Sequence, residues 1–292
     1  MSKCIFCGGK ANFAFRYNHY DICHCEKCHT SFVEKMPTQN ELSEYYNGFK
    51  YEVDEKFKQI IVNENFRKWF NSFNIKENGN MLDIGGGNGY FCLAYEKLGL
   101  GKATYLDLDK EACSYVSSLN ISNVINSNIS DLPTDKKYDF IYCRHVIEHL
   151  IDPRVLIDSA CKLLADDCVF ILQFPNGMSW ERVVDPIILF DRLDRLNTNN
   201  PTFSLLKKLS ILFSKKTSFD LHPKRHLWAI SKNGFENYLQ SKNIEYKIKT
   251  VSIDDPYYSP YAKRSSFFNR IIHRLFSLPY GGAHLVVEIR NR

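Results

Sequence analysis

The sequence lacks the long apolar run that a membrane-spanning helix requires. No stretch reaches the roughly 18 uncharged apolar residues of such a helix, and the first residues show neither the apolar core nor the cleavage site of a secretory signal peptide. A strong charge imbalance is also lacking, since 38 Lys and Arg against 33 Asp and Glu leave a net charge of +5. We therefore expect a cytoplasmic protein, for which an anionic partner is permitted but not required.

Compositional extremes are lacking as well. The 292 residues are 44% hydrophobic and 24% charged, which argues against a disordered chain, a collagen or a coiled coil. The length predicts one large domain, or a main domain with a small module. The ten cysteines are the unusual feature. Disulfide scaffolds are usually short and secreted, so these thiols are expected to bind metal, to pack or to react.

Half of the cysteines lie in the first 28 residues. Two Cys-x2-Cys pairs, separated by 17 residues, match a four-cysteine zinc site. The predicted ligands are Cys4, Cys7, Cys25 and Cys28. Cys23, His24 and His29 are alternative ligands, which the repeated spacing disfavours. Four thiolates close a zinc site to water, so we predict a structural zinc ribbon at residues 1–45, with a hairpin at 12–22.

The centre of the chain predicts the first half of a nucleotide-binding unit. A strand at 81–84 leads into a glycine loop at 85–89 and a helix at 90–98. The loop reads Asp-x-Gly-x-Gly-x-Gly, which differs from the dinucleotide form Gly-x-Gly-x-x-Gly. Asp107 ends the next strand, where a carboxylate suits ribose hydroxyls.

The remaining elements predict an α/β fold. Further strands are expected at 103–106, 123–127, 138–143, 168–174, 245–253 and 284–289. Helices are expected at 41–46, 57–73, 153–164 and 231–240, the first with Thr38 and Glu41 as a capping box. Alternating strands and helices imply a parallel sheet covered on both faces, and the last two strands suggest an antiparallel terminal hairpin.

These features together resemble the class I S-adenosylmethionine-dependent methyltransferases. Residues 82–89 resemble their first motif, and residues 131–133, 138–141 and 146–150 resemble later ones. The ubiquinone-pathway and sugar methyltransferases are the most similar subgroup, and the ribbon with Pro37 and Tyr45-Tyr46 resembles the zinc-binding region of sugar C-methyltransferases. Those enzymes have a further large C-terminal domain without a counterpart in this sequence, which argues against C-methylation.

The resemblance implies a Rossmann-like domain at 46–292 that uses S-adenosylmethionine. The residues implied to bind the cofactor are Asp83, Gly85, Gly86, Gly87, Gly89, Asp107, Leu108, Asn128 and Ile129. A helical insertion at about 176–222 is long for a loop and is expected to form a lid over the substrate. The acceptor is expected to be a sugar or a cell-surface polysaccharide precursor. A quinone-like small molecule and a nucleic acid bound through the ribbon are the alternatives.

Histidines are the candidate bases. In this fold the segment after the fourth strand faces the methyl group, and here it contains His145, Glu148 and His149. His-x-x-Glu-His is also an inverted zinc-protease signature, which the methyltransferase context argues against. The same residues suggest a divalent ion, as in ubiquinone-type enzymes, or a packing role for His149. His222 and His226 flank Lys224 and Arg225 in a second candidate cluster, as either base or anion-binding loop.

The expected partner is an anionic small-molecule or glycan substrate rather than a nucleic acid. The modest charge and a ribbon without basic aromatic lining disfavour RNA binding. Residues 205–216 and 267–276 predict basic amphipathic helices. Such helices either pack with a solvated basic face or lie peripherally on the inner membrane surface. The sequence leaves the oligomeric state open.

Overall fold

The computed structural model describes residues 2–17, 20–46, 64–181, 186–215, 221, 225–252, 255–260 and 281–291. His222, Lys224 and the predicted basic helix at 267–276 lie outside these ranges, and the predicted helix at 57–73 is described from Glu64 onward. Within the described ranges, the helices are too short or too polar to cross a membrane.

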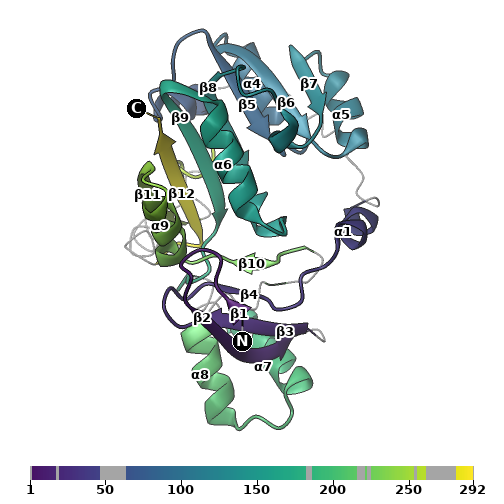
Figure 1. Ribbon diagram of the computed structural model, residues 1–292, viewed down its shortest axis with the longest axis vertical. Coiled ribbons are helices and arrows are strands. Elements are labelled where there is room, and N and C mark those ends of the chain that lie inside the picture. The colour runs from purple at the N-terminus through teal and green to yellow at the C-terminus, as the bar shows by residue number, and fades with distance from the viewer. Residues whose placement is uncertain are drawn as a thin grey trace.

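The larger sheet has seven strands in the order β11-β12-β9-β8-β5-β6-β7 (Figure 1). They are β5 (Gly79–Ile84), β6 (Gly101–Asp107), β7 (Asn123–Asn126), β8 (Tyr138–Arg144), β9 (Leu164–Pro175), β11 (Glu245–Val251) and β12 (His284–Arg290). Strands β5 to β9 are parallel, whereas β12 runs antiparallel to both of its neighbours. The predicted α/β fold, with a mostly parallel sheet and an antiparallel terminal hairpin, is thus confirmed.

Helices cover both faces of this sheet. One face packs against α3 (Glu64–Asn71), α4 (Tyr90–Lys97) and α5 (Lys110–Ser117), and the other against α6 (Pro153–Leu163) and α9 (Lys232–Ser241). Successive strand residues point to opposite faces, so Met81 joins the first layer and Leu82 the second. The continuous apolar strands of the sheet follow from this burial on both sides.

The smaller sheet contains the predicted ribbon and one unexpected strand. Its order is β1 (Ser2–Lys3), β2 (Lys10–Tyr17), β3 (Tyr20–Cys25), β4 (Ser31–Val33) and β10 (Trp228–Ala229). Trp228 of β10 packs its ring 5.7 Å from Phe6 and 5.1 Å from Phe32, measured between centroids. A strand from the C-terminal half of the chain therefore completes this sheet, whereas the sequence predicts a ribbon formed by residues 1–45 alone.

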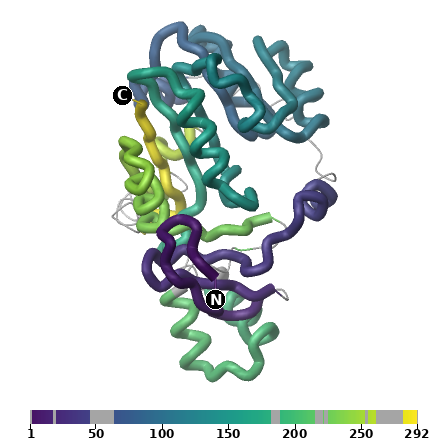
Figure 2. Tube along the Cα trace, viewed as in Figure 1, coloured from purple at the N-terminus to yellow at the C-terminus, as the bar shows by residue number. Residues whose placement is uncertain are grey.

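Two further segments extend from the ribbon. Helix α1 (Gln39–Tyr46) begins with the predicted capping box, in which Glu41 accepts from the Thr38 N–H at 2.7 Å and its own N–H donates to the Thr38 hydroxyl at 3.3 Å. Helices α7 (Pro186–Asn199) and α8 (Leu205–Lys215) pack against the β2–β3 hairpin, at the end of the molecule away from α4 and α5 (Figure 2). That this insertion also closes over the substrate stays a prediction.

Candidate active site

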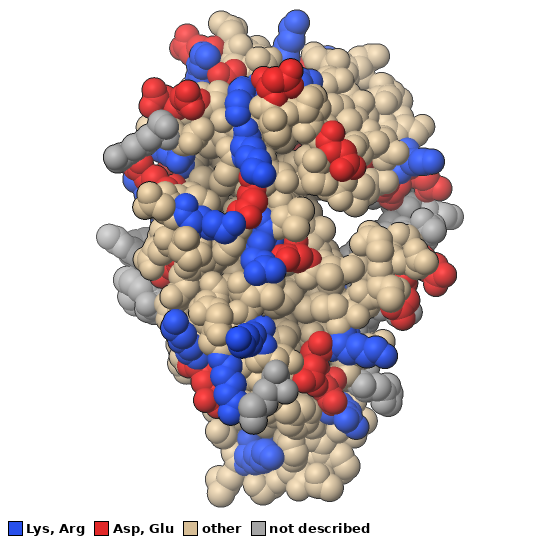
Figure 3. Space-filling view, in the orientation of Figure 1, with Lys and Arg blue, Asp and Glu red and all other residues tan. Residues whose placement is uncertain are grey.

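A cavity lies where the carboxyl ends of three neighbouring strands meet. Strand β5 has β6 on one side and β8 on the other, so the chain order reverses at β5, and such reversal points are where open α/β sheets bind ligands. The cavity measures about 830 Å³, and Figure 3 shows the molecule hollowed between the larger sheet and α1. Its wall includes Gly85 and Gly87 after β5, Asp107 at the end of β6, and His145 after β8. Leu42 and Ser43 of α1 line the opposite side.

The glycine loop needs glycine for two different reasons. Gly85, Gly87 and Gly89 have φ of +64°, +55° and +69°, which L side chains rarely adopt. At Gly86 the reason is space, because a Cβ there would lie 2.3 Å from the Asp83 carboxylate. The loop therefore turns directly over Asp83 and presents main-chain atoms to the cavity.

The buried carboxyl of Asp83 and the half-buried carboxyl of Asp107 support this loop. Burial, with a smaller contribution from the nearby Asp107 charge, raises the pKa of Asp83 to about 7. Burial also raises the pKa of Asp107, against the hydrogen bonds that it accepts from the Asp109 N–H and the Tyr105 hydroxyl, both at 3.0 Å. The Tyr105 hydroxyl also lies 2.8 Å from the Gly87 carbonyl, so it links Asp107 to the loop.

Of the other predicted cofactor residues, Leu108 lies on the cavity wall, whereas Asn128 and Ile129 are not among the residues that line it. Leu108 lines the cavity and is more than half exposed. The Asn128 side chain accepts from the Ser130 N–H at 3.2 Å and caps the 3-10 helix η1 (Ile129–Asp131). Ile129 is buried in the core. The adenine contact expected of Asn128 and Ile129 stays a prediction.

His145 is oriented by a buried carboxylate. Its Nδ1 lies 3.0 Å from Oε1 of Glu148, and its Nε2 is hydrogen-bonded to the Tyr258 hydroxyl. Although burial opposes ionisation, the hydrogen bond from His145 and the positive field of His149 lower the pKa of Glu148. An ionised carboxylate only accepts hydrogen bonds. In the neutral imidazole of His145, this contact places the proton on Nδ1 and leaves the Nε2 lone pair as the basic site.

His149 belongs to a second group on the same segment. Its Nδ1 donates to the Arg225 carbonyl at 2.5 Å, which leaves Nε2 on the side of Glu148, at 3.8 Å. The His226 ring lies 4.9 Å from the His149 ring, and ligand atoms of Glu148, His149 and His226 lie within 4.8 Å of one another. Four of the five predicted catalytic residues thus come together; the fifth, His222, lies outside the described residues.

The local backbone differs from the helix that the His-x-x-Glu-His spacing would suggest. His145 has φ of +54°, and η2 (Ile147–His149) is a single 3-10 turn. This turn still directs His145 and His149 toward Glu148.

The sequence missed the aromatic residues behind His145. Tyr258 is buried, stacks on His284 at 4.2 Å between ring centroids, and has the Arg144 guanidinium 4.6 Å from its own ring. These residues come from a turn near the C-terminal end, from β12 and from β8, so only the folded chain brings them together. Spacing along the sequence contains no signal for such an assembly.

The ribbon gathers the four predicted zinc ligands. Sγ of Cys4 lies 3.6 Å from that of Cys28, Sγ of Cys7 lies 3.5 Å from that of Cys25, and all four lie within 4.8 Å of one another. Burial and neighbouring thiols raise the pKa of Cys7 to about 11. A compact set of four sulfur donors fits tetrahedral zinc. Cys23 is buried beside this group and is not one of its four members.

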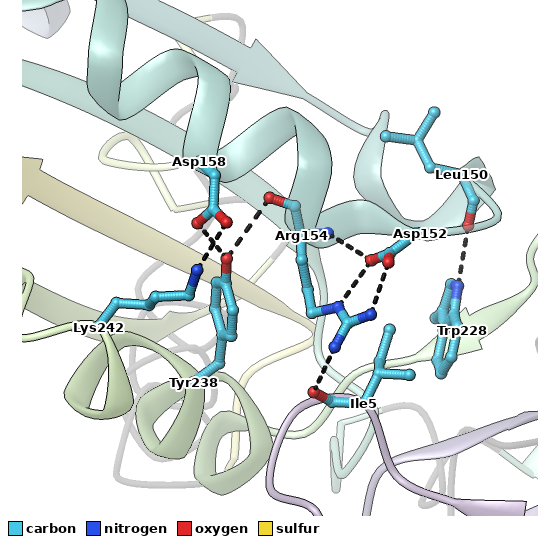
Figure 4. Close-up of polar contacts among 8 residues, drawn as sticks. All are labelled: Ile5, Leu150, Asp152, Arg154, Asp158, Trp228, Tyr238 and Lys242. Atoms are coloured by element: carbon cyan, nitrogen blue, oxygen red, sulfur yellow. Dashed lines mark hydrogen bonds and ion pairs between the residues drawn. The ribbon is translucent and has the colours of Figure 1, made fainter. Parts of the chain in front are cut away.

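Hydrogen bonds fix the ribbon to the active-site loop. The Leu227 N–H donates to the Glu148 carbonyl at 2.8 Å, and the Val33 N–H of β4 donates to the Leu227 carbonyl at 3.1 Å. Figure 4 shows the Trp228 indole donating to the Leu150 carbonyl, 2.9 Å away, and Arg154 of α6 reaching the Ile5 carbonyl. The segment that ends in β10 therefore connects the ribbon to Glu148 and His149.

Comparison with known proteins identifies similar chains. A sequence model described as a methyltransferase domain matches residues 57–245, a range that contains the glycine loop, Asp107 and residues 145–149. The search of curated proteins finds no match.

Several solved structures are also similar. The plantazolicin methyltransferase BpumL in complex with a monoazolic analog and SAH is 17% identical, with 88% of this chain and 91% of that chain covered and a TM-score of 0.47. Coclaurine N-methyltransferase bound to N-methylheliamine and SAH is 12% identical, with coverages of 87% and 89% and a TM-score of 0.47. The YcgJ protein from Bacillus subtilis is 17% identical, with coverages of 78% and 98% and a TM-score of 0.45.

Proposed function

Because this chain belongs to the methyltransferase domain family and is an S-adenosylmethionine-dependent methyltransferase, we propose that it methylates a hydroxyl of a sugar or cell-surface polysaccharide precursor. We propose oxygen as the methylated atom because His145 lies on the cavity wall and is oriented by the buried Glu148. A neutral amine can attack a methyl donor without prior deprotonation, whereas a sugar hydroxyl needs a base as the new bond forms.

The cavity wall fits the cofactor. The glycine loop leaves main-chain atoms open to the cavity, and Asp107 presents a carboxylate at the end of β6. We assign Gly85, Gly87 and Asp107 to the direct contacts, and Asp83 to support of the loop from below. S-adenosylmethionine, when bound, supplies an electrophilic methyl group. The chain itself must hold the acceptor in line and exclude water.

The base acts through the tautomer that Glu148 selects. With the proton held on Nδ1, His145 accepts the acceptor's hydroxyl proton at Nε2, and Glu148 stabilises the imidazolium that results. Tyr258 donates to the same nitrogen when no acceptor is bound, so the acceptor hydroxyl takes its place. An anionic precursor is compatible with Lys110 on the cavity wall and with Arg225 beside His149.

A divalent ion is a second route to acceptor activation, suited to a quinone-like phenol. The observation that favours it is the convergence of Glu148, His149 and His226. A histidine ligand commonly donates its other N–H to a carbonyl, as His149 does to Arg225. Titration of the zinc-loaded protein with Mg²⁺ or Mn²⁺ tests this route, since His226→Ala should abolish any binding that wild type shows.

Methyl transfer from labelled S-adenosylmethionine to nucleotide sugars and lipid-linked saccharides tests the main proposal. We expect Glu148→Gln and His145→Gln to lower kcat by about 10²- to 10⁴-fold, the usual contribution of a general base, with cofactor affinity unchanged. Glu77→Gln, at an exposed position, is the matched control. Full activity in His145→Gln, or transfer only to amines, would overturn the proposal.

A further inference from the structure

The α7–α8 hairpin exposes a concentration of large apolar side chains. Phe190 on α7 is 72% exposed and Leu206 on α8 is 80% exposed, while Leu205 and Phe213 are about half exposed or more. Single exposed apolar residues are ordinary on a protein surface. Four within the 30 residues from Pro186 to Lys215 are a concentration of exposed apolar surface of the kind found at interaction sites.

Helix α8 has apolar side chains around more of its circumference than the part that packs against the rest of the protein. Lys208, Ile211 and Leu212 are buried on the side that faces the ribbon hairpin. Leu206 and Phe213, seven residues apart, share a different side because seven residues make about two turns. Leu205 and the partly buried Leu209 lie between the two sides, so the apolar surface continues from the packed side into solvent.

The charge of this helix has one sign. Leu205–Lys215 contains three lysines and no acidic residue, and of these lysines Lys207 is exposed whereas Lys208 is buried. The Lys207 ammonium lies 3.5 Å from the ring centroid of Phe203, next to the apolar side chains. On α7, Asp191 is paired with Arg195 at 2.9 Å. The lowest part of Figure 3, where Figure 1 places the hairpin, is mostly uncharged surface with a basic side chain, and both basic and acidic side chains lie above it.

We propose that the α7–α8 hairpin docks on a bilayer surface with anionic headgroups. Leu206, Phe213 and Phe190 would enter the interface while the exposed Lys207 contacts the headgroups, which is how basic amphipathic helices bind membranes. The hairpin lies on the ribbon, away from the cofactor cavity, so this inference goes beyond the proposed reaction and is independent of the acceptor. A second copy fits less well, because a twofold pairing would bring identical lysine-bearing helices together.

Co-sedimentation of the full chain with vesicles tests this proposal. We expect binding to vesicles that contain phosphatidylglycerol, no binding to pure phosphatidylcholine vesicles, and weaker binding as salt rises. The double variant Leu206→Glu, Phe213→Glu should abolish binding, and Lys207→Gln should weaken it about fivefold. Val155→Glu, at a half-exposed position on α6, is the matched control and should bind as wild type does.

The outcomes separate this proposal from the reaction. Calorimetry with S-adenosylmethionine and thermal unfolding should be the same for wild type and the double variant, which shows that the fold is intact. The proposal is overturned if wild type ignores anionic vesicles, or if the double variant still binds them. It is also overturned if wild type is a dimer that the double variant disperses, since the face would then be a contact between copies.

Discussion

Ser231→Ala tests how much the contact between the ribbon and α9 contributes to the free energy of unfolding. The buried Ser231 hydroxyl accepts from the Gly234 N–H at 2.9 Å as the N-cap of α9, and it also donates to the Cys28 carbonyl. The Thr30 hydroxyl lies 3.1 Å from it. Loss of a cap costs about 1 kcal/mol, and a buried carbonyl left without a donor costs about 1–3 kcal/mol more. We expect a loss of about 2–4 kcal/mol in the free energy of unfolding.

Urea unfolding of the zinc-loaded protein measures this loss. Ser204→Ala is the matched control, because the Ser204 hydroxyl accepts from the Lys207 N–H at 3.3 Å on an exposed helix end and does not touch a metal knuckle. The control should lose about 1 kcal/mol or less. Equal losses in the two variants would refute the reasoning, because Ser231 would then contribute only a cap.

Three further predictions concern the cofactor loop and the metal. Because the pKa of Asp83 is raised to about 7, the folded state keeps this carboxyl protonated between about pH 4 and pH 7, where the unfolded state loses the proton. The free energy of unfolding should therefore fall as pH rises through this range. Asp83→Asn should reduce this pH dependence, measured by unfolding curves at pH 4 to 8. Gly86→Ala should destabilise the fold by about 1–3 kcal/mol through its clash with Asp83 and should weaken cofactor binding. Gly99→Ala has open space around its Cβ but a φ of +68°, so it should strain the backbone and leave cofactor binding intact. Zinc removal by a chelator should unfold the small sheet and lower the melting temperature, and a melting curve insensitive to chelator would contradict a structural metal.

The sequence predicted those parts of the fold that local patterns encode. The capping box at Thr38 and Glu41, the glycine loop and the two Cys-x2-Cys pairs each occupy a few consecutive residues whose chemistry limits their conformation. Their positions are found as predicted, and the zinc itself stays a prediction. Strand and helix positions in the larger sheet were predictable because runs of buried apolar residues mark them.

The sequence could not predict contacts between distant segments. The two-residue strand β10 is too short to leave a hydrophobic pattern, and it exists because β4 offers it an edge. Tyr258 contacts His145 because it stacks on His284 of β12, and β12 pairs with β9 in the larger sheet. His145 and Glu148, which the sequence predicts as catalytic residues, lie 3.0 Å apart, and their catalytic role stays a prediction. The turn that pairs them depends on the left-handed backbone of His145, which a helical spacing does not indicate.

The central claim is that the glycine loop and Asp107 bind S-adenosylmethionine, and calorimetric titration tests it most directly. Asp107→Asn keeps the size of the side chain but loses the charged acceptor that we assign to the ribose hydroxyls. Hydrogen bonds to a charged group contribute about 1.5–3 kcal/mol each. We expect wild type to bind the cofactor, and Asp107→Asn to bind it at least about tenfold more weakly without loss of fold. Absence of binding by the zinc-loaded wild type, or equal affinity in the variant, would contradict it.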